Sequence, residues 1–162
     1  MTPQTTKLDQ IEDFLRQKRV ALVGVSTHPT DFSRVLFREF LYRGYDMVPV
    51  HPGEAEIEGR HCYSHLRDIQ PPVDGALFMT PPEVTAQLVE ECAEAGIKRV
   101  WMFRGAGTGA ATANTVARCE DKGMTVIPGE CPFMFLPKTS WFHRIHGWVR
   151  KMRGTYPECD CE

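Results

Sequence analysis

Short apolar runs alternate with amphipathic stretches along most of this chain. Each run is bounded by glycine, proline or polar residues, as expected of strands that are buried on both faces. The runs cover residues 20–25, 46–50, 73–79, 97–103 and 124–127. Residues with helical spacing follow the first, third and fourth runs, beginning with the apolar positions between Leu36 and Leu41. This alternation predicts βαβ units in an α/β domain.

The predicted fold is a Rossmann-like, doubly wound, five-stranded parallel sheet with helices on both faces. Counting the strands along the chain, we expect the order 3-2-1-4-5, which is common among such folds. The apolar positions between Leu8 and Leu15 predict an N-terminal helix that packs against the sheet. Residues 54–70 are weakly patterned and predict one short helical turn around Leu66.

The chain beyond residue 137 has a different character. An amphipathic helix capped by Ser140 is predicted there, followed by an acidic end. Its apolar face carries Trp141, Ile145, Trp148, Val149 and Met152, and its other face is basic. We therefore expect two parts: residues 1–137 form the Rossmann-like domain, and residues 138–162 form a C-terminal helix and tail that pack on the same domain or at a dimer interface.

Composition narrows the class of protein. With 162 residues, 42% hydrophobic and 25% charged, the chain has the size and composition of one globular domain. A net charge of -2 gives no reason to expect nucleic acid as a partner, and no apolar run is long enough to span a membrane. The polar N-terminus and six scattered cysteines predict a cytoplasmic protein with reduced, mostly buried thiols.

Four turns follow the predicted strands at the edge where an open α/β sheet binds its ligand. They cover residues 24–33, 49–53, 80–83 and 104–109, and all are rich in Gly, Pro, Ser or Thr. The first turn joins a buried strand to a helix start, where unpaired N–H groups favour an anion. These turns predict a nucleotide-like ligand bound beside the first strand.

An NAD(P)-linked oxidoreductase is one alternative. The dinucleotide fingerprint Gly-x-Gly-x-x-Gly is replaced in the first turn by Gly24-x-Ser26-x-x-Pro29, and His51 stands where an acidic residue would hold the ribose. The stretch Gly105-x-Gly107-x-x-Ala110 fits a relaxed fingerprint, but it follows the fourth strand. The first turn therefore disfavours NAD, and the later stretch keeps it open.

A series of short motifs runs through the predicted domain. The motifs are Gly24-Val25-Ser26 with Pro29, Pro49-Val50-His51-Pro52, Val73-Asp74, Thr80-Pro81-Pro82, Gly96-Ile97-Lys98 and Gly129-Glu130-Cys131-Pro132. In their order and spacing, over about residues 15 to 136, they resemble the CoA-binding fold of the succinyl-CoA synthetase α subunit and its small stand-alone relatives.

The resemblance implies a set of ligand-contacting residues. Gly24, Val25, Ser26 and Pro29 would meet the pantetheine and phosphate region, and Ser33 and Arg34 would support phosphates. His51, Pro52, Thr80, Pro81 and Pro82 would flank the adenosine end, while Phe103, Arg104 and Gly105 would line the pocket. Two positions depart from the pattern: Glu54 stands where the synthetases usually have a lysine, and Asp31 lies inside the first loop. Both put negative charge near the expected phosphates.

The function this implies is binding of coenzyme A or an acyl-CoA in an accessory role, as a sensor, a carrier or a subunit that depends on a partner. The phosphorylated histidine of the synthetases belongs to a second domain with no counterpart in this sequence, so we expect no autonomous catalysis. A component of an acyl-CoA ligase remains an alternative, as does a homodimer. Cys131 as a reactive thiol, or zinc at His143, His146, Cys159 and Cys161, is less favoured than structural or solvated roles for these residues.

Overall fold

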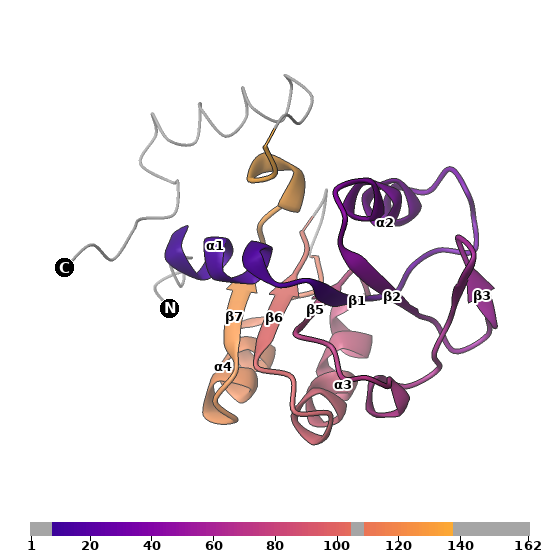
Figure 1. Ribbon diagram of the computed structural model, residues 1–162. Coiled ribbons are helices and arrows are strands. Elements are labelled where there is room, and N and C mark those ends of the chain that lie inside the picture. The colour runs from indigo at the N-terminus through magenta and orange to yellow at the C-terminus, as the bar shows by residue number, and fades with distance from the viewer. Residues whose placement is uncertain (1–7, 105–108, 138–162) are drawn as a thin grey trace.

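The computed structural model describes residues 8–104 and 109–137, which form three layers around a parallel sheet (Figure 1). The sheet has five strands: β1 (Arg19–Val23), β2 (Asp46–Val50), β5 (Gly75–Phe78), β6 (Arg99–Met102) and β7 (Thr125–Pro128). Every neighbouring pair runs parallel. The predicted fold class is therefore confirmed. The predicted helix at residues 138–162 lies outside the described residues.

Helices cover both faces of the sheet (Figure 1). On one face lie α1 (Leu8–Arg16) and α2 (Phe32–Tyr42), and on the other lie α3 (Pro82–Glu94) and α4 (Ala113–Asp121). Each face has its own apolar cluster, one including Phe14 and Phe37 and the other including Cys92 and Val116. Among residues 8–104 and 109–137, no helix has the length and apolar character needed to cross a membrane.

The strand order differs from the prediction. It is β2-β1-β5-β6-β7, so the third strand of the sheet lies between the first and the fourth, and the expected order 3-2-1-4-5 is wrong. The outer edge of β2 is partly occupied by Tyr63, whose backbone accepts from His51 N at 2.9 Å and donates to Pro49 O at 3.0 Å. The chain then crosses to the other edge of β1, where β5 pairs in the register Val20↔Gly75.

The weakly patterned stretch between β2 and β5 holds three small elements. The predicted helical turn is the 3₁₀ helix η1 (Leu66–Asp68), but the sequence did not predict the hairpin of β3 (Glu56–Ile57) and β4 (Arg60–His61). Two-residue strands are too short to leave a periodic pattern. A second 3₁₀ helix, η2 (Pro132–Met134), follows β7.

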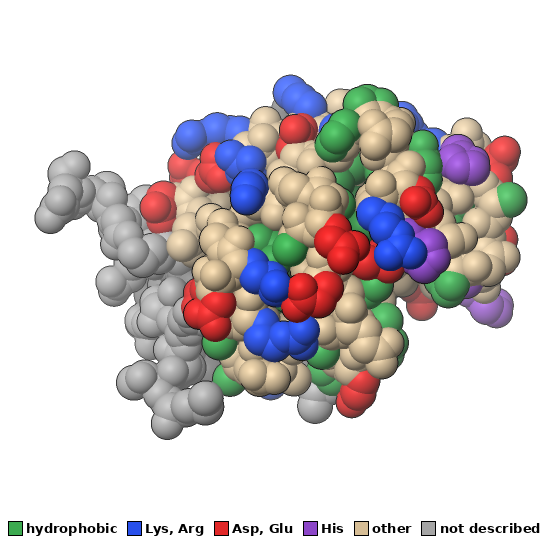
Figure 2. All heavy atoms as spheres, turned by 90° about the horizontal axis from the view of Figure 1, so that it is seen from below, with side chains coloured by type: hydrophobic (Ala, Val, Ile, Leu, Met, Phe, Trp, Pro, Cys, Tyr) green, Lys and Arg blue, Asp and Glu red, His purple; other side chains and the backbone are tan. Residues whose placement is uncertain are grey.

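The surface of α3 and α4 carries charges of both signs (Figure 2). Glu90 pairs with Lys122 at 2.7 Å and with Arg118 at 3.4 Å. Exposed pairs of this kind contribute little to stability. The described residues of this face do not form the single-sign basic patch that is typical of nucleic-acid binding.

Gly75 lets α1 approach the sheet. Phe14 packs edge-on against Trp101 with ring centroids 5.3 Å apart, directly over the start of β5. A Cβ atom on Gly75 would lie 2.9 Å from Phe14 Cε2 and 3.3 Å from Arg99 O. Only the absence of a side chain at this position allows the helix to lie so close.

Gly75→Ala should therefore lower the free energy of unfolding by about 1–3 kcal/mol, the usual cost of overpacking a core. Urea denaturation measures the change. Gly53→Ala is the matched control, since a Cβ there lies no closer than 3.6 Å to another residue. Equal stability of the two variants would contradict the close packing of α1 on β5.

Candidate ligand-binding edge of the sheet

The sheet reverses its direction of growth between β1 and β5. From β1 the chain adds β2 on one side, whereas β5, β6 and β7 extend the sheet on the other side. In open α/β sheets, such a switch point forms a crevice beyond the carboxyl ends of the two strands. The turns that follow β1 and β5 therefore face the same space.

These two turns touch through Gly24 and Thr80. Gly24 has a φ of +85°, and a Cβ atom there would lie only 2.7 Å from Thr80 Cγ2. Both the left-handed backbone and the close approach require glycine. Thus the structure brings together two of the four turns that the sequence singled out.

Thr80 is held by the first turn of α3. The Thr85 hydroxyl, fully buried, donates to Pro81 O at 3.1 Å and lies 2.7 Å from Thr80 Oγ1. Since Thr85 has already used its proton, the Thr80 hydroxyl is the donor in the shorter contact. Pro81 is the N-cap residue of α3 and offers no side-chain acceptor, so no side chain caps the first N–H groups of this helix.

The first loop, in contrast, carries its own anion. Asp31 caps α2 and accepts from Ser33 N at 2.8 Å and from Ser33 Oγ at 2.5 Å. Ser33 Oγ in turn accepts from Ser26 N at 2.8 Å. The hydrogen bonds from Ser33 lower the pKa of Asp31, so the carboxylate stays charged at the start of α2.

Arg34 fastens this loop to the β3–β4 turn. Its Nε and Nη2 atoms donate to Glu58 at 2.9 Å and 2.6 Å, and its Nη1 donates to Ser26 O at 3.1 Å. Glu58 also accepts from Arg38 at 2.9 Å. The two residues expected to support phosphates, Ser33 and Arg34, thus use these polar atoms to shape the first loop.

The other expected residues of the first two turns play different local roles. Val25 is fully buried, so only its backbone can face a ligand. Pro29 accepts from Arg38 Nη2 at 2.8 Å. His51 Nδ1 accepts from Gly53 N at 3.0 Å and closes the turn that carries the exposed Pro52.

Phe103 and Arg104 follow β6 on the far side of β5. The Phe103 ring stacks on Phe32 with centroids 5.4 Å apart. Arg104 is exposed and runs past Gly109, where a Cβ atom would lie 2.9 Å from Arg104 Cβ. Gly105 lies outside the described residues.

Two residues that shape this edge were missed by the sequence analysis. Glu58 lies in the weakly patterned stretch, 24 positions from Arg34, and no local signal marks it. Phe32 is 38% exposed and contacts Phe103 and Phe133. Phe32 stands at the start of α2, beside the predicted anion site, and this position in the sequence could have marked it as a residue of the site.

The cysteines in the described part of the chain are free thiols. Cys62, Cys92 and Cys119 are buried and Cys131 is half-buried. Burial raises the pKa of Cys131, although backbone hydrogen bonds near Phe133 and Met134 partly offset the increase. A thiol with a raised pKa is a poor nucleophile at neutral pH, which supports a structural role. Residues 8–104 and 109–137 contain no cluster of three or more metal-ligating side chains.

The strand order and the turns at β1 and β5 define a doubly wound, Rossmann-like ligand-binding domain. A family model described as a CoA binding domain matches residues 18–137. This chain belongs to the CoA-binding domain family.

Curated relatives include both short and long proteins. The chain is 29% identical over 123 residues to the uncharacterized protein YneT of Bacillus subtilis. That match covers 75% of this chain and 88% of YneT. It is also 29% identical over 91 residues to the α subunit of the ADP-forming acetate–CoA ligase II of Pyrococcus furiosus. That match covers 56% of this chain but spans only 20% of the subunit.

The similar solved structures likewise include both a short protein and a much longer one. A conserved hypothetical protein from Pyrococcus furiosus matches with a TM-score of 0.64 and 32% identity, over 70% of this chain and 95% of that one. An apo dinucleotide-forming acetyl-coenzyme A synthetase from Ca. Korarchaeum cryptofilum matches with a TM-score of 0.64 and 25% identity. The match covers 74% of this chain and 27% of the synthetase.

The cap at Asp31 gives a testable effect on stability. Asp31→Ala should lower the free energy of unfolding by about 1 kcal/mol at neutral pH, and Asp31→Asn by less, because asparagine also caps helices. The folded-state pKa of Asp31 is below its ordinary value of 3.8, so its charge stabilises the fold above that pH. This contribution is lost as the pH falls through the lower folded-state pKa.

Urea denaturation of the wild type and of Asp31→Asn across this pH range isolates the charge. The stability difference between them should shrink in acid. A difference that is constant from neutral pH to below pH 3.8, or that grows in acid, would contradict the ionised cap.

Proposed function

We propose that this protein binds coenzyme A or an acyl-CoA across the carboxyl ends of β1 and β5, in an accessory role without catalysis of its own. The observation that carries the proposal is the close approach of Gly24 and Thr80 at the switch point. It puts two exposed, glycine- and proline-rich turns side by side within a domain whose family is described by CoA binding.

The chemistry of this edge suits such a ligand. The pantetheine arm needs backbone groups and small side chains, and the turn at Gly24, Val25 and Ser26 provides them. Phosphates favour a helix start and a cation, and the start of α3 has no side-chain cap while Arg104 is exposed nearby along the same edge. The turns at His51–Pro52 and Thr80–Pro82 are proposed to flank the adenosine end.

Asp31 limits where the phosphates bind. Its carboxylate already accepts the N–H of Ser33 at the start of α2, and a phosphate there would meet a like charge. Ser33 and Arg34 are therefore proposed to act by holding the first loop in shape. On this basis the pantetheine arm, which is neutral, lies along the first loop.

A partner protein is a further part of the proposal. Relatives that share this domain include subunits named as acetate–CoA ligases, of which this chain spans a small part. We therefore propose a cytoplasmic protein that binds CoA and presents it to a partner subunit or to a second copy of itself. An NAD(P)-linked oxidoreductase is the second candidate, supported by the glycine pattern between Gly105 and Ala110.

Thermal denaturation with matched concentrations of CoA, acetyl-CoA, dephospho-CoA, NAD and NADP tests the proposal. A ligand that binds only the folded state stabilises it by about 2.7 kcal/mol at a hundredfold excess over its dissociation constant. CoA should raise the midpoint, and dephospho-CoA should raise it less if the 3′-phosphate is bound. A shift with NAD and none with CoA would favour the oxidoreductase.

Arg34→Ala should weaken CoA binding by about 1–3 kcal/mol, since it removes charge-assisted hydrogen bonds that fix the first loop. Isothermal titration measures the affinity. Arg67→Ala is the control, because Arg67 is exposed and its pair with Glu94 is long, at 3.9 Å. Unchanged affinity in Arg34→Ala would remove this residue from the site.

A further inference from the structure

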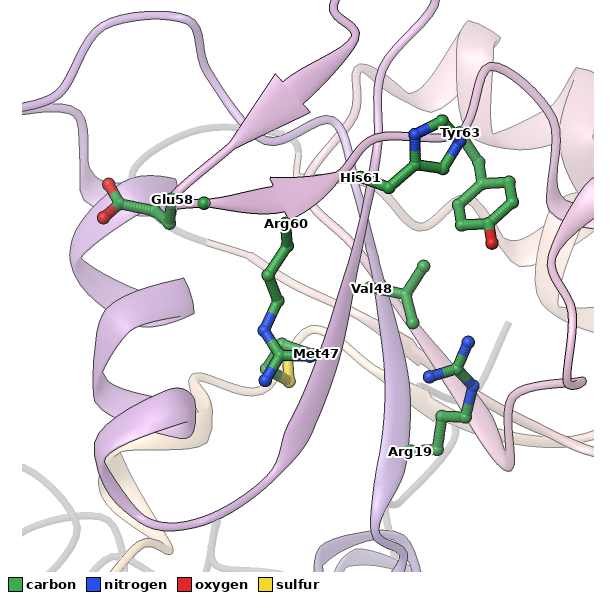
Figure 3. A pocket seen from close by; sticks show the side chains of 8 residues that line it. Arg19, Met47, Val48, Glu58, Arg60, His61 and Tyr63 are labelled. Carbon is green, nitrogen blue, oxygen red and sulfur yellow. The ribbon is translucent and has the colours of Figure 1, made fainter.

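A hollow lies between the edge of β2 and the β3–β4 hairpin, away from the carboxyl edge of the sheet (Figure 3). Its volume is about 440 Å³, within the range of small-molecule sites. It is bounded by Arg19, Met47, Glu58, Arg60, His61 and Tyr63. Because Arg19 and Asp46 begin their strands, the hollow lies toward the amino ends of β1 and β2.

Pro49 is the cause of the hollow. Tyr63 pairs with the outer edge of β2 at Val50, and β4 approaches the same edge two residues earlier in the chain. Continued parallel pairing would need an N–H from residue 49, which proline lacks. The two strands therefore separate before this point, and the space between them stays open.

The separation leaves backbone groups of β2 facing the hollow. Asp46 N donates to Lys18 O and Val50 O accepts from Gly24 N, so the even-numbered residues of β2 pair with β1. In a parallel ladder, the backbone N–H and C=O groups of alternate residues point to opposite sides of the strand, so those of the odd-numbered residues of β2 point away from β1. The N–H and C=O of Met47 are directed toward the hairpin side.

The ion pairs at the hollow leave a small excess of positive charge. Arg19 and Arg60 both line the hollow and share the single carboxylate of Asp46. The carboxylate of Glu58 is neutralised by Arg34 and Arg38, which do not line the hollow. In Figure 3 the carboxylate of Glu58 points away from Arg60 and His61.

Arg60 has donors to offer. Arg19 is held on three sides, by Asp46, by Pro71 O at 2.9 Å and by Gln70 O at 3.4 Å. Arg60 donates from Nη1 to Asp46 at 2.5 Å, and within the described part of the chain its Nε and Nη2 atoms make no hydrogen bond. His61 is exposed, and its ring points away from the Arg60 guanidinium toward Tyr63 (Figure 3), with ring centroids 4.6 Å apart.

We propose that this hollow is a second ligand site, which takes a small oxyanion, a carboxylate or a phosphate group, on Arg60 and the Met47 N–H. Hydrogen-bond donors outnumber acceptors at the hollow, and the carboxylates of Asp46 and Glu58 are each already shared between two arginines. Arg19 and Asp46 act as positioning residues, because they hold the Arg60 guanidinium at the edge of β2. The site is separate from the proposed CoA site and does not depend on it.

Amide NMR of the full chain, titrated with inorganic phosphate and separately with acetate, tests this site. We expect saturable shifts at Met47 and Arg60 with at least one probe, and the probe that binds tells phosphate from carboxylate. Arg60→Gln should weaken the binding by about tenfold or more, as expected for loss of a charge-assisted hydrogen bond. Arg67→Gln, on the surface outside the hollow, should leave it unchanged.

The outcomes separate this site from the CoA site. No saturable shift at Met47 or Arg60 with either probe at tens of millimolar would overturn the proposal, whatever the variants do. Shifts confined to Ser26 and Thr80, or equal binding by Arg60→Gln and the wild type, would overturn it as well. CoA binding should be the same in Arg60→Gln and the wild type, so failure of one proposal leaves the other intact.

Discussion

The guanidinium of Arg34 holds the first loop in place, and the ligand edge depends on that loop. One side chain, only 12% exposed, joins α2, the backbone of Ser26 and the carboxylate of Glu58. Glu58 adopts a φ of 51°, a left-handed conformation that costs a non-glycine residue about 1–2 kcal/mol. The ion pairs with Arg34 and Arg38 offset this cost, so the hairpin and the first loop stabilise each other.

The strand order gives this loop its partner. Since β5 lies beside β1, the turn at Thr80 meets the turn at Gly24, and Thr85 holds it there from inside α3. In the order 3-2-1-4-5 the turn at Arg104 would have taken that place. The observed order therefore makes the start of α3, which lacks a side-chain cap, the nearest helix start across the switch point. Asp31 makes the start of α2 the less suitable of the two for an anion.

The sequence predicted those features that local patterns encode. Strand β2 was predicted to the residue, because a buried strand leaves a signal in the local composition. The strand order could not be read in this way, since the pairing of Tyr63 with the outer edge of β2 leaves no local pattern in the sequence. The pair of Arg34 and Glu58 joins segments far apart in sequence, and the β3–β4 hairpin is too short for a pattern. The turns of the ligand edge were predicted, but which turns meet was not.

The most direct test of this account is a crystal structure of the protein with CoA. We expect CoA to lie across the turns at Gly24 and Thr80, with its phosphates toward the start of α3 and Arg104. The hydrogen bonds from Arg34 to Glu58 should stay intact. CoA bound at another edge of the sheet would contradict the account. So would phosphates at the start of α2 in place of the Asp31 carboxylate.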